Sequence, residues 1–208
     1  MRSLPDLRLM LVTDPGMTAG RRLVETVRAA LEGGVTAVQL RDKTMPDEAM
    51  IALGQELVAA LAPHGVPLVV NDRVAVAAAI GAHLHVGQDD GDPAAARAAI
   101  GPDAILGLSV TRAGEIATVD PAIVDYVGLG PVFATGTKPD AAPPLGLDGF
   151  AAIAGVLPVP SVAIGGIDAA NAAAVMAAGA AGIAVVSAIC AADDPRAAAA
   201  ALRKAVEG

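Results

Sequence analysis

Three polar side chains at the end of an apolar run could bind a phosphate group. Gln39, Arg41 and Lys43 alternate with Leu40 and Asp42, and alternate side chains of an extended chain lie on the same face. Arginine binds phosphate oxygens through two parallel hydrogen bonds, and lysine binds them as a point charge. The trio is therefore a candidate site for a phosphate or pyrophosphate. The alternative is a solvated strand end that carries an Arg-Asp-Lys surface cluster.

Acidic residues follow two later apolar runs in the same way. Asn71-Asp72 ends one run, and Asp89-Asp90 comes shortly after the next. Carboxylates at the ends of neighbouring parallel strands can reach one metal ion, and Mg2+ usually takes one or two protein carboxylates together with water and phosphate oxygens. The pattern favours a site for a magnesium pyrophosphate, and the alternative for Asp72 is a helix cap.

Glycines and a serine near the C-terminus indicate a second phosphate site. Gly165-Gly166 and Ser187 each follow an apolar run, and paired glycines allow backbone N–H groups to approach a phosphate closely. The structural alternative for the glycines is a tight turn before a helix. One phosphate site with a metal and one without would imply two phosphorylated ligands.

A long segment without periodic patterning spans residues 128–146. Thr135, Thr137 and Lys138 would contribute two hydroxyls and a cation from this segment. Long loops in compact domains are usually functional, so we expect this segment to act as a lid.

The elements that must position these residues are strands alternating with helices. Apolar, β-branched runs occupy residues 7–13, 36–40, 67–70, 83–86, 104–108, 123–129, 161–164 and 182–186. Eight such units in 208 residues leave about 26 residues each, and alternating β and α elements build a parallel sheet. The sequence predicts one α/β catalytic domain over residues 1–208, a (β/α)8 TIM barrel whose active groups meet at the C-terminal strand ends. A doubly wound open sheet is the alternative, but its Gly-x-Gly-x-x-Gly turn is missing after the first strand.

The expected helices carry ordinary start and stop signals. They span residues 21–31, 46–61 and 169–178, and further helices begin at Pro93 and Pro195. Asp92, Asp168 and Asp194 precede three of these helices, at positions where a carboxylate can cap the first turn.

Composition excludes several classes of function. A formal net charge of -8 argues against nucleic-acid binding, because phosphate backbones are bound by basic surfaces. No apolar run has the length of a membrane span and no signal peptide is recognisable, so we expect a cytoplasmic protein without membrane contact. Cys190 is the single cysteine, and its apolar neighbours indicate a buried structural thiol.

Taken together, the motifs resemble the thiamine-phosphate synthase family along essentially the whole chain. The resemblance is carried by residues 38–43 (Val-Gln-Leu-Arg-Asp-Lys), 71–73 (Asn-Asp-Arg), 85–90, 107–109, 128–138, 164–167 and 186–187. It implies a transferase of thiamine biosynthesis that joins 4-amino-5-hydroxymethyl-2-methylpyrimidine diphosphate to 4-methyl-5-(2-phosphoethyl)thiazole, the thiazole phosphate carboxylate. Thiamine phosphate forms and pyrophosphate leaves in a dissociative step, with one Mg2+ per active site.

The resemblance also implies a role for each site residue. The pyrimidine diphosphate would be held by Gln39, Leu40, Arg41, Asp42, Lys43, Asn71, Ser109 and Lys138. The thiazole phosphate would be bound by Thr135, Gly136, Thr137, Gly166, Val186 and Ser187. Asp72 and Asp90 would ligate Mg2+, and Arg41, Lys43, Lys138 and Ser109 would be catalytic.

Some features depart from the family pattern or leave alternatives open. The family often has Tyr where Met10 stands and Asp-Gly near His83-Leu84. His83 and His85 receive no ligand role and are expected to be core or supporting residues. The rival functions are a thiazole tautomerase-like isomerase and a non-catalytic barrel that binds phosphate ligands. The sequence leaves open whether the chain forms a homo-oligomer.

Overall fold

Eight parallel strands form a closed barrel in a computed structural model that describes residues 4–18, 20–136 and 142–208. The strands are β1 (Leu9–Val12), β2 (Ala37–Leu40), β3 (Leu68–Asn71), β4 (His83–Val86), β5 (Leu106–Val110), β6 (Tyr126–Leu129), β7 (Ser161–Ile164) and β8 (Gly182–Val185). Each strand pairs with the next along the chain, and β8 closes the barrel by pairing with β1. The predicted TIM barrel is therefore confirmed.

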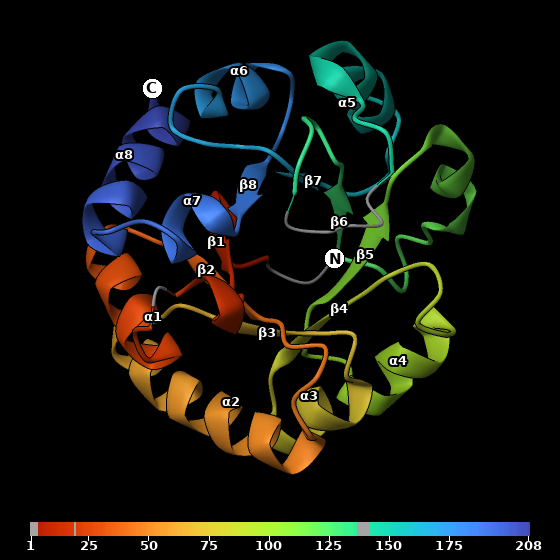
Figure 1. The fold of residues 1–208 in the computed structure, drawn as a ribbon. Helices are drawn as coiled ribbons and strands as arrows, with labels where there is room; N and C mark the ends of the chain where they lie inside the picture. The colour runs from red at the N-terminus through yellow and green to blue at the C-terminus, as the bar shows by residue number, and fades with distance from the viewer. Residues whose placement is uncertain (1–3, 19, 137–141) are drawn as a thin grey trace.

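The helices form a ring around the strands (Figure 1). They are α1 (Leu23–Glu32), α2 (Asp47–Leu61), α3 (Val74–Ile80), α4 (Pro93–Ile100), α5 (Gly146–Ala154), α6 (Ala172–Ala177), α7 (Ser187–Cys190) and α8 (Pro195–Glu207). Within the described ranges, none of these helices combines the length and apolarity needed to cross a bilayer.

One of the eight units lacks an α-helix between its strands. The connection from β5 to β6, described throughout, contains only a 3-10 helix at Ala113–Thr118. Glu115 stabilises this short connection, because its carboxylate accepts hydrogen bonds from the Thr111 backbone N–H and hydroxyl. The two strands that the sequence predicted on either side of this connection are both present. The layer of helices outside them is thinner here than around the rest of the barrel.

The strands are buried on both faces because helices cover the outside and side chains fill the inside. Residues such as Leu11, Val38 and Val70 belong to the layer shared with the helices. A separate cluster fills the barrel, with Leu4 and Leu7 packed against it from the segment before β1. Parallel strands buried on both faces carry nearly continuous apolar runs, which is why the strands were visible in the sequence.

Strand ends differ from the expected ones in a way that matters for the site. Asn71 is the last residue of β3, and Ser109 lies within β5. Both side chains therefore stand on strands rather than on the loops that follow.

Two of the three expected helix caps are confirmed. Asp92 accepts a hydrogen bond from Ala94 N, and Asp194 accepts one from Ala197 N. Asp168 instead caps a turn, because it accepts from Ala170 N and Asn171 N, and α6 begins only at Ala172. The expected helix over residues 169–178 was wrong at its start for this reason.

Candidate active site

The end of β2 is anchored to β1 through a buried hydroxyl. Arg41 N donates to Thr13 Oγ1 over 3.0 Å, and Thr13 Oγ1 donates to Arg41 O over 3.4 Å. The Arg41 and Lys43 side chains follow this anchor, and neither has a hydrogen bond or ion pair with residues 4–18, 20–136 or 142–208. Two cations with a fixed backbone and no partner in the described chain are available to an anionic ligand. Thr13 was not identified as a site residue from sequence.

Asp42 and Arg73 hold the loop that carries these cations. Asp42 Oδ1 accepts from Thr44 N over 2.8 Å and from Met45 N over 2.9 Å. Burial alone would raise the pKa of Asp42, but these hydrogen bonds and the charge of Arg73 outweigh it and lower the pKa. Arg73 donates to Asp42 O and Lys43 O over 3.4 and 3.3 Å. The Asp42 side chain thus stabilises the turn that presents the two cations.

Arg73 also joins this loop to the one after β3. Its guanidinium forms an ion pair with Asp47 in the first turn of α2. Because Arg73 directly follows Asp72 in the chain, one side chain connects the loop that presents the cations to the loop that presents Asp72.

Asp72 and Asp90 bring two carboxyl groups together at the ends of β3 and β4. Burial, a hydrogen bond with Asp90 and the charge of Asp90 raise the pKa of Asp72 from 3.8 to about 6, whereas Lys43 and Arg41 act to lower it. All four predicted residues therefore lie within electrostatic reach of one carboxyl group. Asp90 is held in place by Gly87 N, which donates to Asp90 Oδ2 over 2.6 Å.

The backbone at Asp72 has an uncommon conformation. Asp72 has φ of 63° and is the single non-glycine residue with positive φ in the described part of the chain. Its N–H donates to His85 O over 2.8 Å. Left-handed non-glycine residues cluster at functional sites, and here the conformation places the carboxyl group toward Asp90.

The carboxyl pair has the donor chemistry of a magnesium site. Two oxygen donors from Asp72 and Asp90 approach each other beside Arg41 and Lys43. Mg2+ uses few protein carboxylates and completes its shell with water and substrate phosphate, so these residues fit the expected ion.

A chain of buried polar side chains connects four strands inside the barrel. His85 Nδ1 lies 3.0 Å from Tyr126 Oη, and His85 Nε2 lies 2.9 Å from Ser109 Oγ. Gln39 lies close enough to Tyr126 to act on its hydroxyl, where it opposes the rise in the pKa of Tyr126. Burial lowers the pKa of His85 to about 4 and raises that of Tyr126. His85 is buried, as expected, whereas Tyr126 was missed because a tyrosine in an apolar run looks like core.

The loops after β6 and β7 pack directly on each other. Val132 N donates to Ile164 O over 2.9 Å, and Phe133 N donates to Gly165 O over 3.0 Å. Gly166 has φ of +65°, and a Cβ there would lie 2.6 Å from Ala134 O. The paired glycines are therefore required by this loop contact.

The remaining predicted residues are placed as follows. Gly166 and Ser187 are exposed after β7 and β8, Val186 is half-buried, and Ser187 opens α7. Thr135 is half-buried and Gly136 exposed in the loop after β6, while Thr137 and Lys138 lie outside the described residues. Leu40 is 0% exposed and packs on the helix side of the barrel, so only its backbone can face a ligand.

Cys190 lies behind the rim of the barrel formed by the loops at the C-terminal ends of the strands. Its Sγ is 3.8 Å from Val12 O, where α7 lies between α8 and the end of β1 (Figure 1). The thiol is buried as expected, and burial raises its pKa.

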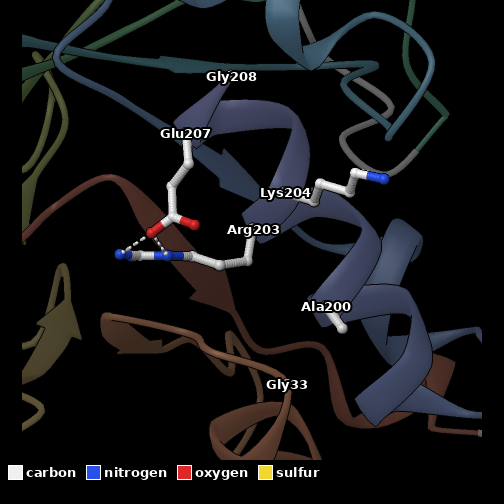
Figure 2. Close-up of a pocket in the computed structure, with 6 residues that line it drawn as sticks. All are labelled: Gly33, Ala200, Arg203, Lys204, Glu207 and Gly208. Atoms are coloured by element: carbon white, nitrogen blue, oxygen red, sulfur yellow. Dashed lines mark hydrogen bonds and ion pairs between the residues drawn. The ribbon is translucent and has the colours of Figure 1, made fainter.

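A surface cleft of about 430 Å3 lies at the opposite end of the barrel, between the end of α1 and the end of α8 (Figure 2). Arg203 lines it and is paired with Glu207 over 2.5 Å and with Asp6 over 3.6 Å. Because the site residues follow the C-terminal ends of the strands, this cleft is separate from them. The Arg203 guanidinium forms ion pairs that stabilise the end of α8.

The fold and the rim together define a class of protein. A TIM barrel that gathers unpaired cations and a carboxyl pair at the C-terminal ends of its strands is typical of enzymes that act on phosphorylated small molecules.

Comparisons with known proteins identify the family within that class. The family model described as thiamine monophosphate synthase matches residues 9–189. A thiamine-phosphate synthase of Azorhizobium caulinodans is 54% identical over 203 residues, covering 97% of this chain and 96% of the relative. One of Xanthobacter autotrophicus is 52% identical over 202 residues, with the same coverage of 97% and 96%. The structure of a thiamine phosphate pyrophosphorylase from Pyrococcus furiosus is 38% identical with a TM-score of 0.88, over 97% of this chain and 96% of that one. The chain therefore belongs to the thiamine monophosphate synthase family and is a transferase.

Proposed function

We propose that the chain joins 4-amino-5-hydroxymethyl-2-methylpyrimidine diphosphate to 4-methyl-5-(2-phosphoethyl)thiazole, forming thiamine phosphate and pyrophosphate with Mg2+. The family membership supports the overall reaction. The magnesium requirement and the order of bond breaking are supported by the chemistry of the rim.

The observation that carries the proposal is the carboxyl pair beside two unpaired cations. Asp72 has a pKa raised to about 6 by burial and by Asp90, so the pair is electrostatically unfavourable when fully ionised. A divalent cation relieves the repulsion, and a diphosphate then completes the charge balance with Arg41 and Lys43. Mg2+ held by Asp72 and Asp90 would supply positive charge close to the departing pyrophosphate.

The residues of this chain contribute binding and orientation rather than a nucleophile. Arg41 and Lys43 hold the diphosphate oxygens and stabilise the negative charge that develops as the C–O bond breaks. Gln39 and Ser109 face the pyrimidine ring, and Asn71 lies beside the diphosphate. The aminopyrimidine disperses the positive charge on its methylene carbon, and the thiazole nitrogen attacks that carbon once the two rings are in line.

The other end of the site would bind the second substrate. Thr135, Gly136, Gly166, Val186 and Ser187 contact the thiazole phosphate in this proposal, using hydroxyl and backbone N–H donors. Thr137 and Lys138 belong to the same loop, and Lys138 would add a third cation for the leaving pyrophosphate. Lys138→Ala should therefore lower turnover more than it weakens thiazole phosphate binding.

One incubation tests the proposal. Purified protein is mixed with both substrates with and without Mg2+, and products are followed by mass spectrometry and pyrophosphate release. Thiamine phosphate and pyrophosphate in equal amounts, formed only with Mg2+, are expected. Isomerised thiazole without pyrophosphate would indicate the tautomerase, and tight binding without product would indicate a binding protein. Either result would overturn the proposal.

A further inference from the structure

The hydrogen-bonded polar side chains inside the barrel are surrounded by apolar residues. Met10, Val69, Val162 and Ala184 form the apolar interior around Tyr126, and His85 and Tyr126 are 7% and 1% exposed. Burying polar groups in such a place is costly unless they are hydrogen-bonded. The positions of the two side chains therefore require an explanation beyond filling space.

Two glycines make room for this pair. A Cβ at Gly107 would lie 2.3 Å from Tyr126 Cζ and 2.4 Å from His85 Nδ1, and one at Gly128 would lie 2.9 Å from His85 Cε1. Gly107 pairs with His85 on one side and with Tyr126 on the other in the strand register. The barrel thus omits two interior side chains so that the histidine and the tyrosine can meet.

The hydrogen bonds define a direction along the chain. The Gln39 amide nitrogen lies 3.7 Å from Met10 Sδ, an atom that can only accept, so the nitrogen side of the amide faces the interior. From there Gln39 acts on the Tyr126 hydroxyl and opposes the rise in its pKa, as an N–H donor to the phenol oxygen does. A hydroxyl that accepts from Gln39 uses its own proton for His85 Nδ1, 3.0 Å away. An imidazole that accepts at Nδ1 carries its proton at Nε2 and donates it to Ser109 Oγ over 2.9 Å.

The series of hydrogen-bonded side chains ends at Ser109, on the side that faces the candidate active site. Ser109 is half-buried on β5, and within the described part of the chain its hydroxyl has no bond other than that to His85. Because this oxygen already accepts from His85, its proton remains free to donate outward. The backbone there is also fixed, since Gln88 Nε2 donates to Ser109 O over 2.7 Å.

We propose that His85 and Tyr126 are positioning residues that hold Ser109 as a hydrogen-bond donor toward a ring nitrogen of the pyrimidine substrate. The inference rests on the proposed function, because that function supplies a heteroaromatic ligand with acceptor nitrogens. Neither residue touches the ligand. They transmit the orientation of the Gln39 amide to Ser109 through a neutral imidazole protonated at Nε2.

Calorimetric titration of the Mg2+-loaded protein separates ring recognition from diphosphate binding. The ligands are the pyrimidine diphosphate, without thiazole, and inorganic pyrophosphate, which has no ring. His85→Asn places its amide near Nδ1 and removes the donor to Ser109, so we expect the pyrimidine diphosphate to bind about tenfold more weakly. Pyrophosphate should bind within about twofold of wild type, and equal weakening of both ligands would overturn the proposal.

Matched variants test whether His85 acts through Ser109. His85→Gln can place an amide nitrogen near Nε2, and it should retain most of the affinity that His85→Asn loses. Ser109→Ala should weaken pyrimidine diphosphate binding to the same extent as His85→Asn, and the double variant should be no weaker than either. Additive losses would show that His85 and Ser109 act separately, which contradicts the proposal.

The tautomer can be observed directly, and Tyr126→Phe keeps the ring volume if changes at His85 prevent folding. Nitrogen-15 NMR of the three histidines should show His85 protonated at Nε2 in wild type, with loss of that preference in Tyr126→Phe. A proton at Nδ1 in wild type would overturn the proposal. If ring-specific binding is lost as expected but the wild type forms no thiamine phosphate, the proposed reaction fails while this inference stands.

Discussion

The two ends of the barrel use charged residues in opposite ways. At the N-terminal ends of the strands, Arg97 pairs with Asp125, and their side chains are 11% and 7% exposed. At the C-terminal ends, Arg41 and Lys43 have no such partner in the described chain, and two carboxyl groups are placed against each other. One end uses charge for stability, and the other keeps its charged groups, in the proposed function, for binding ligands.

The same contrast appears in the hydrogen bonds of the guanidinium groups. Arg97 also donates to Ile123 O over 2.9 Å and to Gly101 O over 3.3 Å, so its binding capacity is used within the protein. Buried charges that are fully paired support structure, whereas removing one partner is strongly destabilising. Charge at one end should therefore control stability, and charge at the other should control activity.

Asp72→Asn gives the largest expected effect. Loss of one of the two carboxylates should lower kcat/KM by about 10²–10³-fold. Asparagine tolerates the left-handed backbone at this position, and removing like-charge repulsion should raise Tm in Mg2+-free buffer at pH 8 by about 3 °C. Enzyme assays and thermal melts measure the two changes. A variant that loses activity and stability together would place Asp72 on the structural side of the comparison.

Asp125→Ala should produce the reverse pattern. It leaves Arg97 without its buried partner and removes the acceptor for Leu106 N, 2.8 Å away. The free energy of unfolding should fall by about 3 kcal/mol, while kcat/KM at 20 °C stays within about twofold. Urea denaturation and steady-state kinetics measure both.

A matched control for that change is Glu56→Ala. Glu56 pairs with Arg22 at the surface, where the side chains are 44% and 68% exposed, and the expected loss is below about 1 kcal/mol. Equal losses in the two variants would remove the distinction between buried and surface pairs.

Arg41→Ala should raise KM for the pyrimidine diphosphate by about 10–100-fold, because charge-assisted hydrogen bonds contribute about 1.5–3 kcal/mol. Lys43→Ala should act in the same direction. Tm should change little, since neither side chain has a partner in the described chain. Lys204→Ala, which removes an exposed cation from the cleft at the opposite end, is the control and should leave KM unchanged.

The pH dependence of stability should show the strained carboxyl pair in Mg2+-free protein. Burial and Asp90 raise the pKa of Asp72 from 3.8 to about 6, so between these values the folded protein holds a proton that the unfolded chain has released. The free energy of unfolding contributed by this group therefore falls as pH rises from about 4 to about 6, and is constant above. Subtracting the denaturation curves of Asp72→Asn isolates this slope. Parallel curves would contradict it.

Asp47→Ala should give the smallest effect. It removes the ion pair of Arg73 but leaves the hydrogen bonds of Arg73 to Asp42 O and Lys43 O. We expect KM for the diphosphate to rise about threefold, because surface pairs contribute about 0–1 kcal/mol. Kinetics at several salt concentrations would test it, since the difference from wild type should shrink as salt is added.

The parts of the molecule predicted correctly from sequence are those fixed by local patterns. Short apolar runs identified all eight strands, and polar residues directly after them located the carboxyl pair and the cations. Boundaries were less accurate, as at Ser109, because strand pairing rather than residue type determines where β5 ends.

The parts that could not be predicted depend on contacts between distant strands. Nothing in the run around Tyr126 indicates that its hydroxyl meets His85, which is 41 residues away. Thr13 gave no signal either, since its role exists only where β1 and β2 end together. Gly107 and Gly128 offered a clue, because an interior strand position occupied by glycine often faces a bulky neighbour.

The packed interior of the barrel determines how molecules reach and leave the site. Apolar side chains fill the interior, and Leu4 and Leu7 pack against them from the N-terminal end, so there is no channel along the axis through the described residues. In the proposed reaction, both substrates and both products would therefore enter and leave at the C-terminal ends of the strands. A product that stays bound there prevents the next substrate from binding. The order in which the products leave therefore affects turnover.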